Sequence, residues 1–189
     1  RQRQMCIRDR SSIDPAEFDH FLMFAFENEP RLMPHIHFSV QHGDDVILKR
    51  MKRRHLARDV IRLCKEMRRR RPDTVFGADL IAGFPTETDR AHEATIRLIE
   101  EADLSHLHVF SYSDREGTPA AKMPKTKPSD IKRRALALRE MGRKQLDKLV
   151  SLRVNKYDEL LLELIPEDEL IPEDSLYAVS YTHLRAHET

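Results

Sequence analysis

The alternation of apolar, strand-like runs with amphipathic helical stretches is the feature of this sequence that most restricts its fold. Residues 74–82 are almost continuously apolar apart from Gly77 and Asp79, which is typical of a strand buried on both faces of a parallel sheet. Residues 35–40 and 107–112 also have strand character, and helical stretches separate the three strands. This order predicts βα units on a parallel sheet, in a barrel or in an open α/β fold. Three strands are too few to close a barrel.

Apolar residues at helical spacing predict five helices. They span residues 15–29, 44–51, 56–71, 87–102 and 129–149. Asp14 is a candidate N-cap of the first helix, and Asp44 and Asp45 suit the dipole at the start of the second. Cys64 lies on the apolar face of the third helix, where we expect it to be a small core residue.

The composition is that of a globular protein, with 189 residues, of which 34% are charged. No apolar run approaches the roughly 20 residues that span a bilayer, and residues 1–10 have no apolar signal-peptide segment. We therefore expect no membrane partner and a cytoplasmic location. The two cysteines, Cys6 and Cys64, form no CxxC pair, which argues against a disulfide framework and against a cysteine-bound metal cluster made by this chain alone.

The two ends of the chain differ from the rest. Residues 1–10 and 179–189 lack apolar periodicity and resemble peptides translated from sequencing-adapter DNA. We expect both ends to be non-native and exclude them from the fold. Residues 11–150 then form the core domain, and residues 151–178, in which LIPED occurs twice, stay unassigned.

Three loops that follow the predicted strands combine a glycine with polar or charged residues. They are residues 41–45, 83–87 and 111–119. Ligands of α/β proteins bind at the carboxyl ends of the strands, and a glycine lets the backbone approach a ligand closely. Each loop alone is more often ordinary turn chemistry, but the three in order at βα spacing indicate a binding site.

Three segments carry a family resemblance. HIHFSVQHGDDVILKRMKRRH, FGADLIAGFPTET and HLHVFSYSDREGTPAAKMP resemble successive segments of the radical S-adenosylmethionine (SAM) methylthiotransferases, and SSIDP at residues 11–15 is similar to the family's SSIEP strand end. The resemblance covers residues 11–150. It favours the branch that modifies N6-threonylcarbamoyladenosine at position 37 of tRNA, with the isopentenyladenosine-37 and ribosomal-protein branches as alternatives.

The resemblance implies the later half of a partial (β/α)6 radical SAM barrel, TIM-like, with parallel strands. In the family, an RNA-binding TRAM domain follows the barrel, and residues 151–178 would lead toward it. The family's CxxxCxxC loop, which binds the SAM-cleaving [4Fe–4S] cluster, is absent from this sequence. The implied reaction is reductive cleavage of SAM, hydrogen abstraction from adenine C2 and insertion of a methylthio group. In the intact parent enzyme, an electron donor would reduce the cluster. We therefore expect no catalytic residue in this fragment, and no activity from it alone.

The resemblance also assigns site residues. It implies SAM binding by Asp14, Gln41, Gly83, Phe84, Pro85 and Glu87, and contact with the tRNA substrate by Tyr112 and Arg115. Gln41 offers both a donor and an acceptor, and the carboxylates of Asp14 and Glu87 can accept from ribose hydroxyls or the amino group. His42 stands where much of the family has serine.

A basic segment leaves open a different function. The candidate contacts to RNA phosphates are Lys49, Arg50, Lys52, Arg53 and Arg54. They are compatible with an RNA-binding module without catalysis, and equally with the solvated face of a helix. No aromatic residue is interleaved for base stacking, which argues against a dedicated single-strand binder.

Two His-x-His pairs leave open a metal-dependent hydrolase. His35 with His37, and His106 with His108, each place two imidazoles on one face of a strand. Asp79 is the one candidate carboxylate ligand at a matching place. We therefore favour histidines whose ring nitrogens are satisfied within the sheet, and expect no metal site.

Overall fold

A computed structural model describes residues 12–154 of the chain. The chain divides into two compact units, Arg1–Leu149 and Val150–Thr189. Both expected adapter-derived ends and residues 155–178 of the unassigned tail lie outside the described residues. Within residues 12–154, no helix combines the length and the apolar character needed to cross a membrane.

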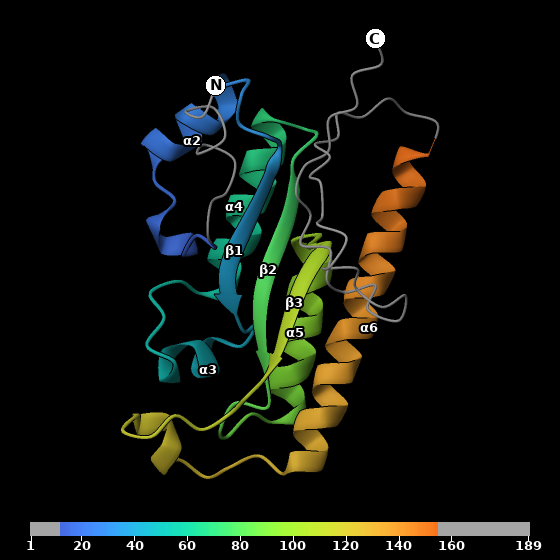
Figure 1. Cartoon of the computed structure of the whole chain (residues 1–189). Coiled ribbons are helices and arrows are strands. Elements are labelled where there is room, and N and C mark those ends of the chain that lie inside the picture. The colour runs from blue at the N-terminus through green and yellow to red at the C-terminus, as the bar shows by residue number, and fades with distance from the viewer. Residues whose placement is uncertain (1–11, 155–189) are drawn as a thin grey trace, which may run out of the picture. The chain divides into compact units, whose positions relative to one another are not determined.

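A parallel three-stranded sheet forms the centre of the described structure (Figure 1). Strands β1 (His35–Gln41), β2 (Val75–Ala82) and β3 (His106–Ser111) are neighbours in their chain order. Ile13 extends the sheet beyond β1, because its N–H donates to the His37 carbonyl at 2.9 Å and its carbonyl accepts from the Ser39 N–H at 2.9 Å. Consecutive strands that are spatial neighbours are typical of a βα barrel, and the expected α/β class is confirmed.

The helices of the described residues follow the predicted order. They are α2 (His20–Asn28), α3 (Asp45–Arg50), α4 (Ala57–Arg70), α5 (Asp89–Glu101) and α6 (Pro128–Arg153), with short 3-10 turns η1 (Pro15–Glu17) and η2 (Pro119–Lys122). The single helix predicted over residues 15–29 is wrong in one respect, since it is divided into η1 and α2. The division occurs because the Asp19 carboxylate accepts from the Leu22 N–H at 2.8 Å and caps a new helix.

The main hydrophobic core lies between the sheet and its helices, and Figure 1 shows α4 and α5 behind the strands. Alternate strand residues enter it, namely Ile36, Phe38, Val40, Phe76, Ala78, Leu80 and Ala82. Cys64 of α4 is fully buried there, as expected. The other face of β2 is only partly covered at Val75, Asp79 and Ile81. The expectation of a strand buried on both faces is therefore wrong, because within the described chain the helical layer covers one face.

A buried group of ionisable side chains joins the loops after β1 and β2 at the carboxyl edge of the sheet. Glu87 follows β2, and its Oε1 lies 3.5 Å from Nε2 of His42 and 3.6 Å from Nδ1 of His92. Arg134 of α6 donates to the Glu87 carbonyl at 2.9 Å, and its guanidinium lies 3.7 Å from Oε2. Burial raises the pKa of Glu87, but its polar contacts with His42 and His92 and the charge of Arg134 outweigh burial and lower the pKa to about 2. We refer to these four residues as the Glu87 cluster.

Two leucines of α6 offer a matched test of the packing. Leu138 is 1% exposed, whereas Leu136 is 55% exposed. We expect Leu138→Ala to lower the free energy of unfolding by about 2–5 kcal/mol, because it leaves a cavity in the core. Leu136→Ala makes the same chemical change in the same helix and should alter stability by no more than about 0.5 kcal/mol. Urea denaturation measures the free energy of unfolding of both variants. Equal losses of stability in the two variants would contradict the packing of α6 on the sheet.

The Glu87 cluster predicts a pH dependence of stability. The pKa of Glu87 falls from 4.5 to about 2 on folding, so its contribution is present above pH 4.5 and is lost as the pH falls toward 2. At pH 7, we expect Glu87→Gln to lower the free energy of unfolding by roughly 3 kcal/mol. Urea denaturation at several pH values should show this difference shrink below pH 4.5.

The control for that experiment is Glu93→Gln, since Glu93 is an exposed residue of α5. This variant should follow the unsubstituted chain within about 0.5 kcal/mol at every pH. A loss of stability in Glu87→Gln that does not vary with pH would contradict an ionised carboxylate at Glu87.

Candidate functional site

The carboxyl ends of the strands meet at one edge of the sheet, and side-chain contacts join the loops that follow them. His42 and Glu87 link the loops after β1 and β2. Arg50, at the end of α3, donates to the Thr86 hydroxyl in the loop after β2. The Phe84 and Tyr112 rings meet edge to face with centroids 5.4 Å apart, which links the loops after β2 and β3. The structure therefore brings together the three loops that the sequence singled out.

Gln41 has an unusual backbone at the end of β1. The pairing of β1 with β2 becomes irregular between Phe38 and Gln41, and Gln41 has a φ of 71°, in the left-handed region. Bulges and positive φ angles at residues other than glycine are concentrated at functional sites, where the local strain serves binding. The Gln41 side chain is half-buried, and its amide makes no hydrogen bond to any other residue of the described range. Its donor and acceptor are therefore available to a ligand.

Asp14, the second expected SAM contact, is bonded within the chain. Its carboxylate accepts from the Ala16 N–H at 2.9 Å and lies 3.3 Å from both Arg53 Nη1 and His55 Nδ1. The Nε2 of the buried His55 lies 3.1 Å from the Val40 carbonyl. Burial raises the pKa of Asp14, but the Ala16 N–H, His55 and Arg53 together lower it. Asp14, which follows Ile13 and caps η1, thus connects this segment to the loop after α3.

The remaining expected SAM contacts form a buried turn. Gly83, Phe84, Pro85 and Glu87 are all buried. Gly83 has a φ of 81°, and a Cβ there would lie 2.5 Å from Cγ1 of Ile131, so this position requires glycine. The Phe84 carbonyl accepts from the Glu87 N–H at 2.9 Å and from the Thr126 hydroxyl at 3.0 Å. The turn is therefore a fixed support for the site, and SAM contact by its four residues stays a prediction.

Tyr112 and Arg115, the expected substrate contacts, lie in the loop after β3. The Tyr112 N–H donates to the Ala82 carbonyl at 2.8 Å, while burial and the nearby Asp114 carboxylate raise the pKa of its hydroxyl. Arg115 is exposed, and its carbonyl accepts from the Thr118 hydroxyl at 2.8 Å. Their contact with a substrate stays a prediction.

Three of the five candidate RNA contacts are engaged within the chain. Arg50 binds a threonine hydroxyl, Arg53 forms an ion pair with Asp14, and Arg54 forms one with Glu17 of η1. Lys49 and Lys52 are exposed, and neither forms an ion pair between residues 12 and 154. These two lysines are the better placed to meet a phosphate.

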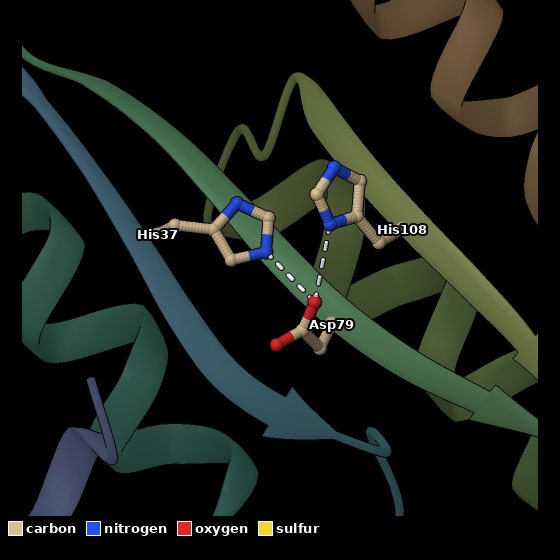
Figure 2. Close-up of side chains that lie close together, drawn as sticks. All are labelled: His37, Asp79 and His108. Atoms are coloured by element: carbon tan, nitrogen blue, oxygen red, sulfur yellow. Dashed lines mark hydrogen bonds and ion pairs between the residues drawn. The ribbon is translucent and has the colours of Figure 1, made fainter. Parts of the chain in front are cut away.

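One histidine from each His-x-His pair meets Asp79 on the sheet face away from α4 and α5, as Figure 2 shows. His37 Nε2 lies 2.9 Å and His108 Nδ1 lies 3.3 Å from the same oxygen, Asp79 Oδ1. The Ser12 hydroxyl donates to the other carboxylate oxygen at 2.5 Å. Burial raises the pKa of Asp79, but its contacts with His37, Ser12 and His108 outweigh burial and lower it. The sequence indicated each of these side chains separately as a candidate metal ligand. Only the register of β1, β2 and β3 shows that they lie together.

The described residues do not fit an iron–sulfur cluster. A cluster needs several thiolate ligands of low pKa. Cys64 is the one cysteine between residues 12 and 154, and burial raises the pKa of its thiol to about 12. SAM fits better, because the half-buried Gln41 amide lies at the edge where ligands of α/β proteins bind.

Comparisons with known proteins agree with this architecture. The model of the radical SAM superfamily matches residues 22–99. A solved structure, coproporphyrinogen III oxidase (HemN) from Escherichia coli, described as a radical SAM enzyme, aligns with a TM-score of 0.51 and 20% identity. The alignment covers 74% of this chain and 31% of that one, and it supports the fold alone.

Two relatives have a higher sequence identity with this chain than the solved structure has. "Threonylcarbamoyladenosine tRNA methylthiotransferase MtaB" of Rickettsia prowazekii is 52% identical over 81% of this chain and 36% of its own length. "tRNA-2-methylthio-N(6)-dimethylallyladenosine synthase" of Ehrlichia chaffeensis is 40% identical over 69% of this chain and 30% of its own length. The chain spans about a third of the length of these relatives. It belongs to the radical SAM tRNA methylthiotransferase family and corresponds to part of the radical SAM domain.

Proposed function

We propose that this chain is part of an enzyme that methylthiolates C2 of N6-threonylcarbamoyladenosine at position 37 of tRNA. The observation that carries the proposal is the 52% identity with the Rickettsia prowazekii relative, whose name states that substrate. The Ehrlichia chaffeensis relative is named for dimethylallyladenosine and is 40% identical, which makes the isopentenyladenosine branch the alternative. An enzyme of this kind would work in the cytoplasm, where its tRNA substrate is found.

SAM binding at the carboxyl edge of the sheet is the part of this function that the described residues would perform. When bound, SAM supplies the radical that removes hydrogen from the adenine ring. Gln41 would hold SAM through its amide, since its irregular backbone presents a side chain without an internal partner. Asp14 and the turn from Gly83 to Glu87 would fix the shape of the edge around it. Tyr112 and Arg115 would contact the nucleoside.

The alternative of a basic RNA-binding module receives less support. Arg53 and Arg54 are committed to ion pairs with neighbouring carboxylates, which reduces the free positive charge of the segment. The exposed Lys49 and Lys52 would then serve as phosphate contacts of the enzyme. Both relatives described above are named for tRNA nucleosides, which favours the tRNA branches over the ribosomal-protein branch.

A segment exchange tests the proposed function. We expect the chain alone to be inactive, because the described residues do not supply cluster ligands. The experiment therefore uses a chimera, in which residues 12–149 replace the aligned segment of the Rickettsia prowazekii relative. The chimera would be expressed in bacteria that lack their own enzyme, and tRNA nucleosides would be measured by mass spectrometry. We expect 2-methylthio-N6-threonylcarbamoyladenosine. Only the dimethylallyladenosine product, or neither product from a folded chimera, would contradict the proposal, and the unaltered relative is the positive control.

The same chimera tests the role of Gln41. Gln41→Ala removes both hydrogen-bonding groups of the amide, so we expect the KM for SAM to rise about tenfold, equivalent to 1–2 kcal/mol of lost binding at roughly 1.4 kcal/mol per factor of ten. Glu93→Gln, on the exposed side of α5, should leave the KM unchanged. An unchanged KM in the Gln41→Ala chimera would show that Gln41 does not contact SAM.

A further inference from the structure

The three side chains in Figure 2 come from three neighbouring strands and converge on the sheet face away from α4 and α5. We propose that His37, Asp79 and His108 bind a divalent transition-metal ion. The ligand atoms are His37 Nε2, Asp79 Oδ1 and His108 Nδ1. We call these residues the His–Asp–His site.

The distances within the site suit one ion. The three ligand atoms all lie within 4.8 Å of one another, and the two nitrogens lie 2.9 Å and 3.3 Å from Asp79 Oδ1. Metal bonds to histidine and aspartate are about 2.0–2.2 Å long, so two ligands at octahedral or tetrahedral angles are roughly 3.0–3.5 Å apart. An ion can therefore replace the two contacts to Oδ1 with modest rotation of the rings.

The chemistry of the ligands indicates the class of metal. Two imidazole nitrogens and one carboxylate oxygen form the protein part of many catalytic zinc sites and of non-haem iron sites. Magnesium and calcium prefer oxygen ligands, so Zn²⁺ or Fe²⁺ fits this set better. His108 has a side chain that is 49% exposed, whereas those of His37 and Asp79 are 14% and 16% exposed. The site is thus closed on the sheet side and open on the other, which leaves room for further ligands.

Two neighbouring residues support the ligand geometry. Ser12 donates to Asp79 Oδ2, the oxygen that the two histidines do not contact, and so orients the carboxylate. Gly77 lies beside His37 on β2, and a Cβ there would lie 2.2 Å from His37 Nδ1. Glycine at this position lets the His37 ring extend over β2 toward Asp79.

The site is separate from the edge at which SAM would bind. His37, Asp79 and His108 each precede by four residues the strand-end positions Gln41, Gly83 and Tyr112. Four residues of strand correspond to roughly 13 Å. The metal proposal therefore stands independently of the proposed methylthiotransferase function.

Calorimetric titration of the metal-free chain with Zn²⁺ tests the proposal, with Co²⁺ absorption as a second readout of the ligand set. We expect one equivalent to bind. Asp79→Asn and His108→Ala should each raise the Kd by about tenfold or more and change the Co²⁺ spectrum. The His108 side chain is half-exposed, so His108→Ala should stay folded, which circular dichroism and a thermal melt would confirm. His20→Ala removes an exposed histidine of α2 and should leave binding unchanged.

Gly77→Ala separates positioning from ligation, because it keeps all three ligands while the new Cβ would lie 2.2 Å from His37 Nδ1 and 3.0 Å from the His106 carbonyl oxygen, so the His37 ring must move most. We expect it to raise the Kd for Zn²⁺ by about tenfold. The proposal is overturned if the unsubstituted chain shows no saturable binding. It is also overturned if Asp79→Asn and His108→Ala bind as the unsubstituted chain does, since the cluster would then be only an internal ion pair of the sheet.

Discussion

The buried carboxylate of Glu87 connects two strand-end loops and two helices at the carboxyl edge of the sheet. It contacts the loop after β1 through His42 and helix α5 through His92, and Arg134 of α6 binds the same residue. An ionised group with a 1% exposed side chain is costly to desolvate, so these partners must stay in place. The carboxyl ends of β1 and β2 and the helices α5 and α6 are therefore held by one electrostatic constraint.

The expected SAM residues divide into two groups by their contacts within the chain. Glu87 and Asp14 have carboxylates that are already engaged within the chain, and the turn at Gly83 is buried. Gln41 alone among them combines a half-buried side chain, a left-handed backbone and an amide without a partner in the described chain. A rigid support beneath one available polar group is the arrangement that preorganised binding requires.

The two faces of the sheet have different chemistry because side chains alternate along each strand. One face carries the apolar residues of the core, such as Phe38 and Phe76. The other carries His37, Asp79 and His108, whose polar groups bind one another. Apolar packing and polar chemistry can thus occupy the same three strands without competing.

The sequence by itself determined the α/β class, the order of strands and helices, and the three loops, because apolar periodicity and glycine turns are local properties. It also carried the family resemblance, since runs of identical residues need no coordinates. Only the tertiary structure decided that Asp19 divides the first helix, that Asp14 and Glu87 are engaged internally, and that Asp79 lies between His37 and His108. The division at Asp19 depends on a competition between local helix caps. The other findings depend on contacts between residues far apart in the chain, because neither strand register nor the partner of a buried charge can be read from spacing along one sequence.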